Sequence, residues 1–455
     1  MVDGVTQFEL TNEYLDRLKE AIDQQDISFI KESLAGVKPA DITDTLHEFN
    51  AEDSKYVIDL LEPEIGAEII KDLDEDVRLK FLKSFTPDDI SNFLVYMDSD
   101  DAVDILNEQP IKIREEAIAK LEDQEKVNYI MELLRYDEDC AGGLMAKELI
   151  KANLNWTVIQ CIEEIRRQAG KIQKIYSVYV VDDQDKLLGR VSLKKIILAD
   201  DNKQVKDIYE DNVVAVETYL DEDEVAAIMR KYDLDAVPVI NVQGKLLGRI
   251  TIDDIIDVIT EQAEEERQLM SGISEDVEED DSIWMLTRAR LPWLIIGLAG
   301  GVLGASLIGV FEKDLIRITA IAFFIPLIMA TGGNVGIQSS SLVVQSLANP
   351  SAFNQPISKK LVKVLIVALI NGILLGGIVF GVISLINNSN KLAFVVSLAL
   401  FTVVVIASFL GTIVPLLLDK IKINPALASG PFITTAIDLV GLAVYFSVAH
   451  LLYNL

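Results

Sequence analysis

Residues 430–452 read GPFITTAIDLVGLAVYFSVAHLL and contain one acid, Asp438, with no lysine or arginine. The stretch exceeds the roughly 20 apolar residues that a helix needs to cross a bilayer. Five stretches of this kind cover 291–311, 318–347, 364–387, 392–418 and 423–455, and Asp438 is the only charge in them. Because a helix satisfies its own backbone hydrogen bonds in hydrocarbon, we expect five membrane-spanning helices.

The charge of the chain is divided unevenly. The 455 residues contain 72 acids and 41 lysines or arginines, but residues 291–455 hold only 4 of these acids and 8 of these bases. Residues 1–290 keep the other 68 acids and 33 bases, a net charge of −35. This excludes a single soluble domain and indicates an acidic, water-exposed part joined to a membrane part. It also argues against nucleic acid as a partner, because phosphates would be repelled.

Cysteines and loop charges predict the location. Two cysteines, Cys140 and Cys161, suggest no disulfide framework and suit a reducing compartment. The start, MVDGVTQFEL, indicates no cleaved signal peptide. The lysines and arginines on the side of the acidic part are Arg288, Arg290, Lys359, Lys360, Lys363, Lys420 and Lys422, against Lys313, Arg317 and Lys391 opposite. We therefore expect a multi-pass protein of the cell (inner) membrane, with its N-terminus cytosolic and its C-terminus outside.

Helix-breaking residues occur in the second and fifth stretches. Residues 331–341 read TGGNVGIQSSS, and Pro425, Gly430 and Pro431 open the fifth stretch. Glycine and proline weaken the helical hydrogen-bond ladder, and the freed carbonyls are tolerated at membrane depth only inside protein or along a water-filled path. We expect broken helices along such a path. The alternative is that the glycines allow close helix packing and the hydroxyls bond to the preceding turn.

Asp438 is the most informative single residue. A charged side chain at the bilayer centre costs about 2.5–3.5 kcal/mol or more, so it normally faces a partner or an aqueous pathway. We interpret it as a carboxylate presented to a permeating cation; the alternative is a protonated aspartate that hydrogen-bonds between helices. The serines at 339–341 would suit a hydrolase, but no histidine or lysine near them in sequence can act as a base, so we expect no enzyme.

Residues 62–109 contain a repeat of twelve residues: EPEIGAEIIKDL, DEDVRLKFLKSF, TPDDISNFLVYM and DSDDAVDILNEQ. Each copy has an apolar pair at its eighth and ninth positions, and its acidic or proline-containing start is typical of a helix N-terminus. Short helices that bury these pairs would stack as a superhelix. Asp100 and Asp104 of the last copy share one helical face beside Asp101, and such like charges destabilise a helix unless a cation lies between them.

A second repeat has a period of 59 residues, because KLLGRVSL at 186–193 matches KLLGRITI at 245–252. Its order of helix, strand, turn, strand and helix resembles a tandem pair of CBS (cystathionine-β-synthase) domains over about 139–260. The resemblance implies an α+β fold and a module that senses ligands, among them adenosine nucleotides such as ATP.

The same resemblance implies a ribose contact by an aspartate three residues after a threonine or serine. The second copy has this pattern as Thr251 and Asp254, whereas the first has Ser192 followed by Lys195. One of the two sites implied by the resemblance therefore departs from the pattern.

The acidic stretch that follows joins the CBS pair to the first membrane stretch. Residues 263–282 contain nine acids and one base, and no proline occurs before Pro292. Blocks of like charge are often disordered. Here we expect a connecting helix over 262–290, with Trp284, Arg288 and Arg290 at the bilayer surface.

The abundant carboxylates favour a hard cation with oxygen ligands, and magnesium often binds such ligands through retained waters. The chain has no calcium-loop motif and no cysteine–histidine cluster for zinc. The order of its parts, with Gly332, Gly333, Asn334, Gly336 and Gln338 in the second stretch and Pro431, Thr434, Thr435 and Asp438 in the fifth, resembles the MgtE family of magnesium channels.

The resemblance implies a homodimer whose two Asp438 side chains bind hydrated magnesium, with Asn334, Thr434 and Thr435 nearby. It also implies regulatory magnesium sites that close the pore. These fall on Asp100, Asp104, Asp221, Asp223, Asp233, Asp254, Asp257, Glu265 and Glu266. Asn424 and Gln262 stand where the family can have an acid, which weakens or removes those contacts.

We therefore expect a multidomain chain: an all-α superhelical domain (1–137), CBS domains (138–200 and 201–261), the connecting helix (262–290) and a five-helix transmembrane domain (291–455). The expected function is magnesium uptake through a channel in the bilayer that cytosolic magnesium closes. The alternatives are a channel for cobalt, manganese or nickel, or a nucleotide-sensing membrane receptor that transports nothing.

Overall fold

The computed structural model describes residues 10–73, 75–170, 172, 174–275, 277, 281–348, 356–387, 389–428 and 430–454, without the side chains of 75, 76, 348 and 387. Three sequence features fall partly outside these residues: the N-terminal stretch examined for a signal peptide, the start of the second twelve-residue copy, and part of the acidic stretch before the first span. The chain divides into two compact units, Met1–Ile259 and Thr260–Leu455.

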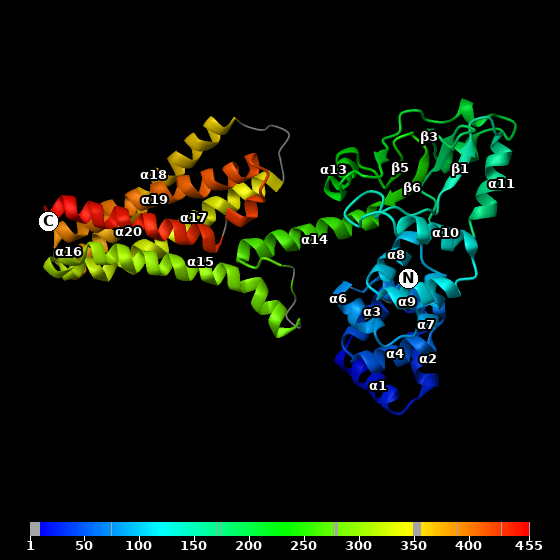
Figure 1. Cartoon of the computed structure of the whole chain (residues 1–455), viewed down its shortest axis with the longest axis horizontal. Helices are drawn as coiled ribbons and strands as arrows, with labels where there is room; N and C mark the ends of the chain where they lie inside the picture. Colours follow the sequence, from blue (N-terminus) through cyan, green and yellow to red (C-terminus); the bar gives the residue numbers. More distant parts are fainter. Residues whose placement is uncertain are drawn as a thin grey trace, which may run out of the picture. The chain divides into compact units, whose positions relative to one another are not determined.

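The first unit begins with short helices, shown from blue to cyan in Figure 1. They are α1 (Asn12–Asp23), α2 (Ile27–Leu34), α3 (Pro39–His47), α4 (Ala51–Leu60), α5 (Pro63–Lys71), α6 (Glu75–Leu82), α7 (Pro87–Leu94), α8 (Ser99–Asn107), α9 (Ile111–Lys120) and α10 (Gln124–Leu133). α3 packs on α5, α5 on α7 and α7 on α9, so alternate helices stack as a superhelix.

The twelve-residue repeat predicts the core of this superhelix. The eight residues of its apolar pairs are all buried: Ile69, Ile70, Phe81, Leu82, Phe93, Leu94, Ile105 and Leu106. The starts of the copies also act as expected. Thr86 caps α7 in a capping box with Asp89, and Pro87 occupies the first turn.

Two three-stranded sheets follow, and the second repeats the first. β1 (Ile150–Asn153) pairs in parallel with β2 (Val178–Val181), which pairs antiparallel with β3 (Leu187–Val191); β4 (Val216–Glu217), β5 (Ala236–Ile240) and β6 (Leu246–Thr251) repeat this order. α11 (Val158–Gln168), α12 (Leu193–Leu198), η1 (Val205–Asp207) and α13 (Glu222–Tyr232) complete the two CBS domains. The 59-residue period reproduces even the register shift, between Val180 and Val181 in one sheet and Val239 and Ile240 in the other.

A long helix, α14 (Ile252–Ser271), follows β6. The expectation of one connecting helix over 262–290 is corrected, because α14 ends at Ser271 and Gly272 adopts a φ of +81°. A new helix starts after Ser282, whose side chain accepts a hydrogen bond from the Met285 N–H. Trp284, Arg288 and Arg290 therefore belong to the first membrane helix.

Over the part of the chain that the structure describes, five helices are long and apolar enough to cross a membrane, and all lie in the second unit. They are α15 (Ile283–Val310), α17 (Ile325–Ala348), α18 (Ile357–Asn387), α19 (Asn390–Lys420) and α20 (Pro431–Tyr453), with the short α16 (Glu312–Arg317), η2 (Thr319–Phe324) and η3 (Pro425–Ala428) between them. α19 packs against α17, α18 and α20, and α15 packs against α20 (Figure 1). The five predicted spans are confirmed.

The glycines of the second span do not break it, contrary to our expectation. α17 is continuous over 325–348, and its glycines face neighbouring helices. A Cβ at Gly336 would lie 1.9 Å from Cδ1 of Ile437, and one at Gly411 would lie 2.5 Å from the Gly336 carbonyl oxygen. The close-packing alternative therefore accounts for this motif. In the fifth span the chain does change from η3 to α20 ahead of Pro431, with Gly430 at a φ of +58°.

Candidate functional site

Asp438 lies two turns into α20. The Thr434 hydroxyl, one turn earlier, donates to the Gly430 carbonyl at 2.9 Å and satisfies a backbone group at the helix start. Asp438 is half-buried, and neither a hydrogen bond nor an ion pair joins its carboxylate to another of the described residues. A carboxylate within an apolar helix that has no partner among the described residues is available to water or to a cation.

α17 lies directly against this part of α20. A Cβ at Gly333 would be 3.1 Å from Thr434 Cγ2 and 3.8 Å from Asp438 Oδ1, so the absent side chain at 333 lets the two helices meet beside the carboxylate. Asn334 follows Gly333 and is exposed. The structure thus brings Gly333 against Thr434 and Asp438, whereas Asn334 lies about 100° further around α17 on an exposed face.

Thr435 occupies a different contact. A Cβ at Gly300 of α15 would lie 2.0 Å from Thr435 Cγ2, so the methyl group of Thr435 fills the notch that this glycine leaves. The contact assigns Thr435 to the packing of α15 against α20.

Our sequence analysis identified only part of a polar face on α17 and missed Gln345. Asn334, Gln338 and Gln345 are exposed, and Ser341 is half-buried. At 100° per residue these four positions fall within about 60° of one another around the helix. Their spacing of three or four residues along the sequence is the signal that identifies Gln345 as part of the same face.

In the first unit, carboxylates of α8 and the start of α14 form an acidic cluster. Its members are Asp98, Asp100, Asp101, Asp104, Asp253, Asp254 and Asp257. Asp100 is only 7% exposed. Ion pairs hold its flanks, between Asp101 and Lys71 at 2.8 Å, between Asp98 and Arg249 at 3.2 Å and between Asp253 and Lys174 at 3.6 Å. The Asp100–Asp104 pair predicted from helical spacing is thus extended by three aspartates that are distant in sequence.

Crowding of these negative charges changes their protonation. Asp104 is exposed at the surface, but desolvation among its crowded neighbours, followed by repulsion from Asp101, raises its pKa to about 8, although Arg78 acts in the opposite direction. Burial raises the pKa of Asp254 to about 6, with repulsion from Asp101 adding to it. The pKa of Asp100 is also well above its usual value, for burial and then for the neighbouring Asp101. The cluster is therefore held at an electrostatic cost that a bound cation would relieve.

The fit of this cluster to magnesium follows from its donors. No group of three or more histidine, cysteine, aspartate or glutamate side chains in the described ranges is arranged to chelate a metal directly. All seven donors are nonetheless carboxylates, which suit a hard cation that keeps several waters. The donor chemistry fits magnesium bound through water.

The other predicted regulatory acids are more dispersed. Asp221 accepts a hydrogen bond from the Asp223 N–H at 3.1 Å and caps α13, whereas Asp233 ends the same helix with a φ of +52°. Eleven residues of helix separate the two ends by about 16 Å, so these three do not form one site. Glu265 and Glu266 lie on the later part of α14, in the second unit.

Thr251 and Asp254 satisfy each other. The Thr251 hydroxyl donates to Asp254 Oδ2 at 2.7 Å and its N–H donates to the same oxygen at 3.1 Å. Both contacts are those of a helix N-terminus, here the start of α14. The aspartate predicted to hold a ribose therefore already accepts two hydrogen bonds from Thr251 and belongs to the acidic cluster.

Asn424 also makes a local contact, because its side-chain oxygen accepts a hydrogen bond from the Ala426 N–H at 2.9 Å.

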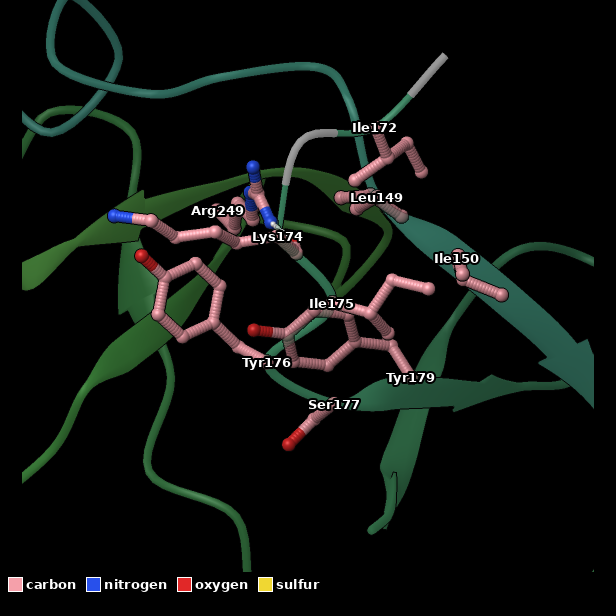
Figure 2. A pocket seen from close by; sticks show the side chains of 9 residues that line it. All are labelled: Leu149, Ile150, Ile172, Lys174, Ile175, Tyr176, Ser177, Tyr179 and Arg249. Atoms are coloured by element: carbon pink, nitrogen blue, oxygen red, sulfur yellow. Dashed lines mark hydrogen bonds between the residues drawn. The ribbon is translucent and has the colours of Figure 1, made fainter. Parts of the chain in front are cut away.

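Two cavities lie in the CBS pair. The first, between Leu149, Ile172 and Arg249, encloses about 200 Å³, and Figure 2 shows Lys174, Tyr176 and Arg249 at one end of it. The second encloses about 330 Å³ and is lined by Tyr179, Arg190, Asn212, Val213, Val214, Leu234, Ala236 and Pro238.

Comparison with known proteins covers nearly the whole chain. Residues 325–448 match the family model of MgtE, a divalent cation transporter; residues 37–139 match the MgtE intracellular N domain; and residues 141–202 and 205–261 match the CBS domain. The Magnesium transporter MgtE of Thermus thermophilus is 32% identical over 441 residues, 96% of this chain and 97% of that protein. The chain belongs to the MgtE family.

Further MgtE proteins support the same relationship. The Magnesium transporter MgtE of Enterococcus faecalis is 35% identical over 72% of each chain, and that of Bacillus subtilis is 30% identical over 87% of this chain and 93% of its own. A solved structure described as the cytosolic domain of the Mg²⁺ channel MgtE in complex with ATP has 32% identity and a TM-score of 0.51, covering 54% of this chain and 99% of that one.

Membership of the MgtE family confirms the resemblance that we inferred from the two repeats and the membrane motifs. It agrees with the architecture described above: a helical N-terminal domain, a CBS pair with its sheets, and a region of five apolar helices. The protein is thus a multi-pass membrane protein.

Proposed function

We propose that this MgtE-family protein carries magnesium across the membrane through a path that Asp438 lines. The observation that supports this most directly is a half-buried carboxylate in a membrane helix that none of the described residues neutralises. Its relatives of similar length are magnesium transporters by name, which favours magnesium as the ion.

The proposed conducting form is a homodimer with one Asp438 from each chain. Two carboxylates balance the charge of one divalent ion. Thr434, one turn before Asp438 on α20, and Asn334, on the exposed face of α17, would hydrogen-bond to the water shell of the ion, because magnesium loses its waters reluctantly. In the first unit, Ile197 and Ile256 occupy equivalent positions of the 59-residue repeat and are 79% and 55% exposed, which suits a surface covered by a second copy.

Passive uptake is sufficient for this function. With the acidic unit in the cytosol, the membrane potential favours entry of a divalent ion by roughly 4.6 kcal/mol per 100 mV. The chain has no P-loop motif that would couple transport to ATP hydrolysis.

Magnesium in the cytosol would close this path by binding to the acidic cluster. Repulsion among Asp100, Asp104 and Asp254 opposes their close approach, and a bound divalent ion removes that repulsion. An ion that binds one conformation more tightly shifts the population toward it. Asp221, Asp223, Asp233, Asp257, Glu265 and Glu266 are proposed to contribute further contacts. Deletion of residues 1–137 is then expected to leave conduction intact and to weaken inhibition by internal magnesium.

A nucleotide such as ATP is the second proposed regulator. The relative solved with ATP supports binding somewhere in this region. At Thr251 and Asp254 a ribose would have to replace their mutual hydrogen bonds, whereas the larger cavity beside Arg190 needs no such exchange. Equilibrium dialysis of ATP against Asp254→Ala and Arg190→Ala variants separates the two locations.

Flux into proteoliposomes tests the transport proposal. Vesicles with a magnesium-sensitive dye inside and an imposed negative potential should show uptake with the native chain and none with Asp438→Ala or Asp438→Asn. Asp419→Asn, at an exposed position near the end of α19, is the matched control and should conduct normally. Native-like flux from the Asp438 variants would remove the assignment.

The same vesicles separate the alternatives. A channel for cobalt, manganese or nickel would show a preference for that ion when metals compete at equal concentration. A nucleotide-sensing receptor would show no flux of any of these ions, together with tight nucleotide binding.

A further inference from the structure

Lys71, the last residue of α5, brings a positive charge to the acidic cluster. Its Nζ lies 2.8 Å from Asp101 Oδ2, and 42% of its side chain is exposed, against 14% for Asp101. The pair joins two helices of the superhelix across 30 residues of sequence. Lys71 can leave this contact for solvent by rotation of its side chain alone, because its stem is partly exposed.

The charge of Lys71 reaches both helices of the cluster. Its electrostatic partners are Asp98, Asp100 and Asp101 of the α8 region and Asp253, Asp254 and Asp257 of α14. A single ammonium thus interacts with six carboxylates from two segments of the chain. Of the described residues, the ammonium contacts only Asp101, but it partly neutralises the charge of both segments.

Other cations near the cluster are also paired, among them Lys174, whose Nζ lies 3.6 Å from Asp253 Oδ2, a longer contact than that of Lys71. Arg78 bonds to Glu108 through Nε at 2.8 Å and Nη2 at 2.5 Å. Arg249 donates to Asp98 and to the carbonyl oxygen of Lys174. These guanidinium groups are fixed by several bonds each, so they are poor candidates for displacement.

We propose that the Lys71 ammonium is a built-in competitor of the regulatory divalent cation, and that its displacement sets the magnesium concentration to which the cluster responds. The inference rests on the proposed role of the cluster as a magnesium site. The lysine neutralises part of the cluster when magnesium is scarce. A doubly charged ion with its water shell then replaces it as the concentration rises.

Removal of the lysine charge should therefore strengthen magnesium binding. Lys71→Gln leaves the carboxylates with one positive charge fewer, so a divalent ion gains more attraction and no longer displaces a competitor. The concentration for half-maximal binding should fall on the order of tenfold, as expected for a unit charge about 6 Å from a divalent ion where solvent brings the effective dielectric constant close to that of water, about 80. Lys71→Arg keeps the charge and should respond like the native chain.

Magnesium-dependent protection from limited proteolysis measures this shift without reference to transport. The full-length chain in detergent is titrated with magnesium chloride at constant ionic strength, and cleavage within the first unit is followed. Lys112→Gln is the matched control, because Lys112 is 87% exposed and pairs only loosely with Glu116 at 3.9 Å. Lys71→Met, which keeps the aliphatic stem, replaces Lys71→Gln where the glutamine variant does not fold.

The inference predicts a midpoint that moves to lower magnesium in Lys71→Gln or Lys71→Met and stays unchanged in Lys71→Arg and Lys112→Gln. The inference is wrong if the native chain is protected by magnesium but the midpoint of Lys71→Gln or Lys71→Met equals that of Lys112→Gln or moves to higher magnesium. Two other outcomes would reject the cluster as a magnesium site, and the inference with it. One is that magnesium does not protect the native chain; the other is that it fully protects an Asp104→Asn, Asp254→Asn double variant.

Discussion

Gly333 of α17 lies against Asp438 of α20, so closely that a Cβ at 333 would be 3.8 Å from the carboxylate oxygen. The contact links two motifs that are about 100 residues apart in sequence. It explains why the second span can contain so many glycines and remain a helix, because each missing side chain is replaced by a neighbouring helix. The space beside Asp438 is consequently set by the size of residue 333.

Enlarging residue 333 should impair transport before it impairs folding. Gly333→Ala places its methyl group 3.1 Å from Thr434 Cγ2, so we expect a modest loss of flux; Gly333→Val adds bulk beside Asp438 and should abolish it. Overpacking of this kind costs about 1–3 kcal/mol. The measurements are proteoliposome flux and thermal unfolding in detergent. Gly377→Ala, where no atom lies within 4 Å of the added methyl, is the control and should leave both unchanged.

The two threonines before Asp438 should respond differently to the same substitution. Thr435→Val keeps the methyl group that fills the notch at Gly300, so flux and stability should stay near native. Thr434→Val removes the hydroxyl that donates to the Gly430 carbonyl beside the proposed ion path, and flux should fall severalfold. Equal losses in both variants would show that Thr435 also contributes its hydroxyl to the path.

The sequence predicts the repeated parts of this fold well, because repetition averages out local ambiguity. The apolar pairs, such as Ile69 and Ile70, recur at a fixed position in four copies, and all are buried. The 59-residue period likewise predicts two equivalent sheets. β1 and β4 escaped prediction, because they do not lie at the 59-residue spacing that identifies the other strands.

The glycine motif and the acidic cluster show what sequence alone could not settle. A run such as Gly332, Gly333 and Gly336 is compatible with a broken helix and with close packing, and only the neighbouring helix decides between them. The cluster joins Lys71, Asp101 and Asp254 from three separate segments. No periodicity relates these positions, so their proximity follows from the packing of the CBS pair against the superhelix within the first unit.

The stability of the first unit should fall as the pH rises when divalent ions are absent. The folded-state pKa values of Asp254 and Asp104 are raised to about 6 and about 8, above the unfolded value near 3.9. The folded chain therefore binds more protons than the unfolded chain between these limits. The stabilisation is complete below the unfolded pKa and is lost as the pH passes through about 6 and then about 8.

Thermal unfolding of the full chain in chelator at a series of pH values measures this dependence. Asp104→Asn should flatten the part between pH 6 and 8, whereas Asp16→Asn, at an exposed position on α1, should not. Added magnesium should restore stability most at the highest pH. A midpoint that rises with pH in chelator would contradict the protonation of the cluster.

Arg249 should be the most sensitive single position for stability of the first unit. Its side chain is 5% exposed, donates to Asp98 at 3.2 Å and to the Lys174 carbonyl oxygen at 2.9 Å, and lies 5.2 Å from the centre of the Tyr176 ring. Replacing it with methionine leaves Asp98 without its nearest cation. Breaking a buried pair in this way typically costs about 3–5 kcal/mol.

A paired substitution distinguishes that electrostatic cost from a loss of packing. Burial, followed by repulsion from Glu148, already raises the pKa of Asp98, and removal of Arg249 should raise it further. Asp98→Asn should therefore recover part of the stability lost in Arg249→Met, when both are measured by urea unfolding at pH 7.5. The losses of unfolding free energy add for independent sites but not for coupled ones. If the losses in Arg249→Met and Asp98→Asn add fully, Arg249 acts through Tyr176 and the Lys174 carbonyl rather than through the Asp98 carboxylate.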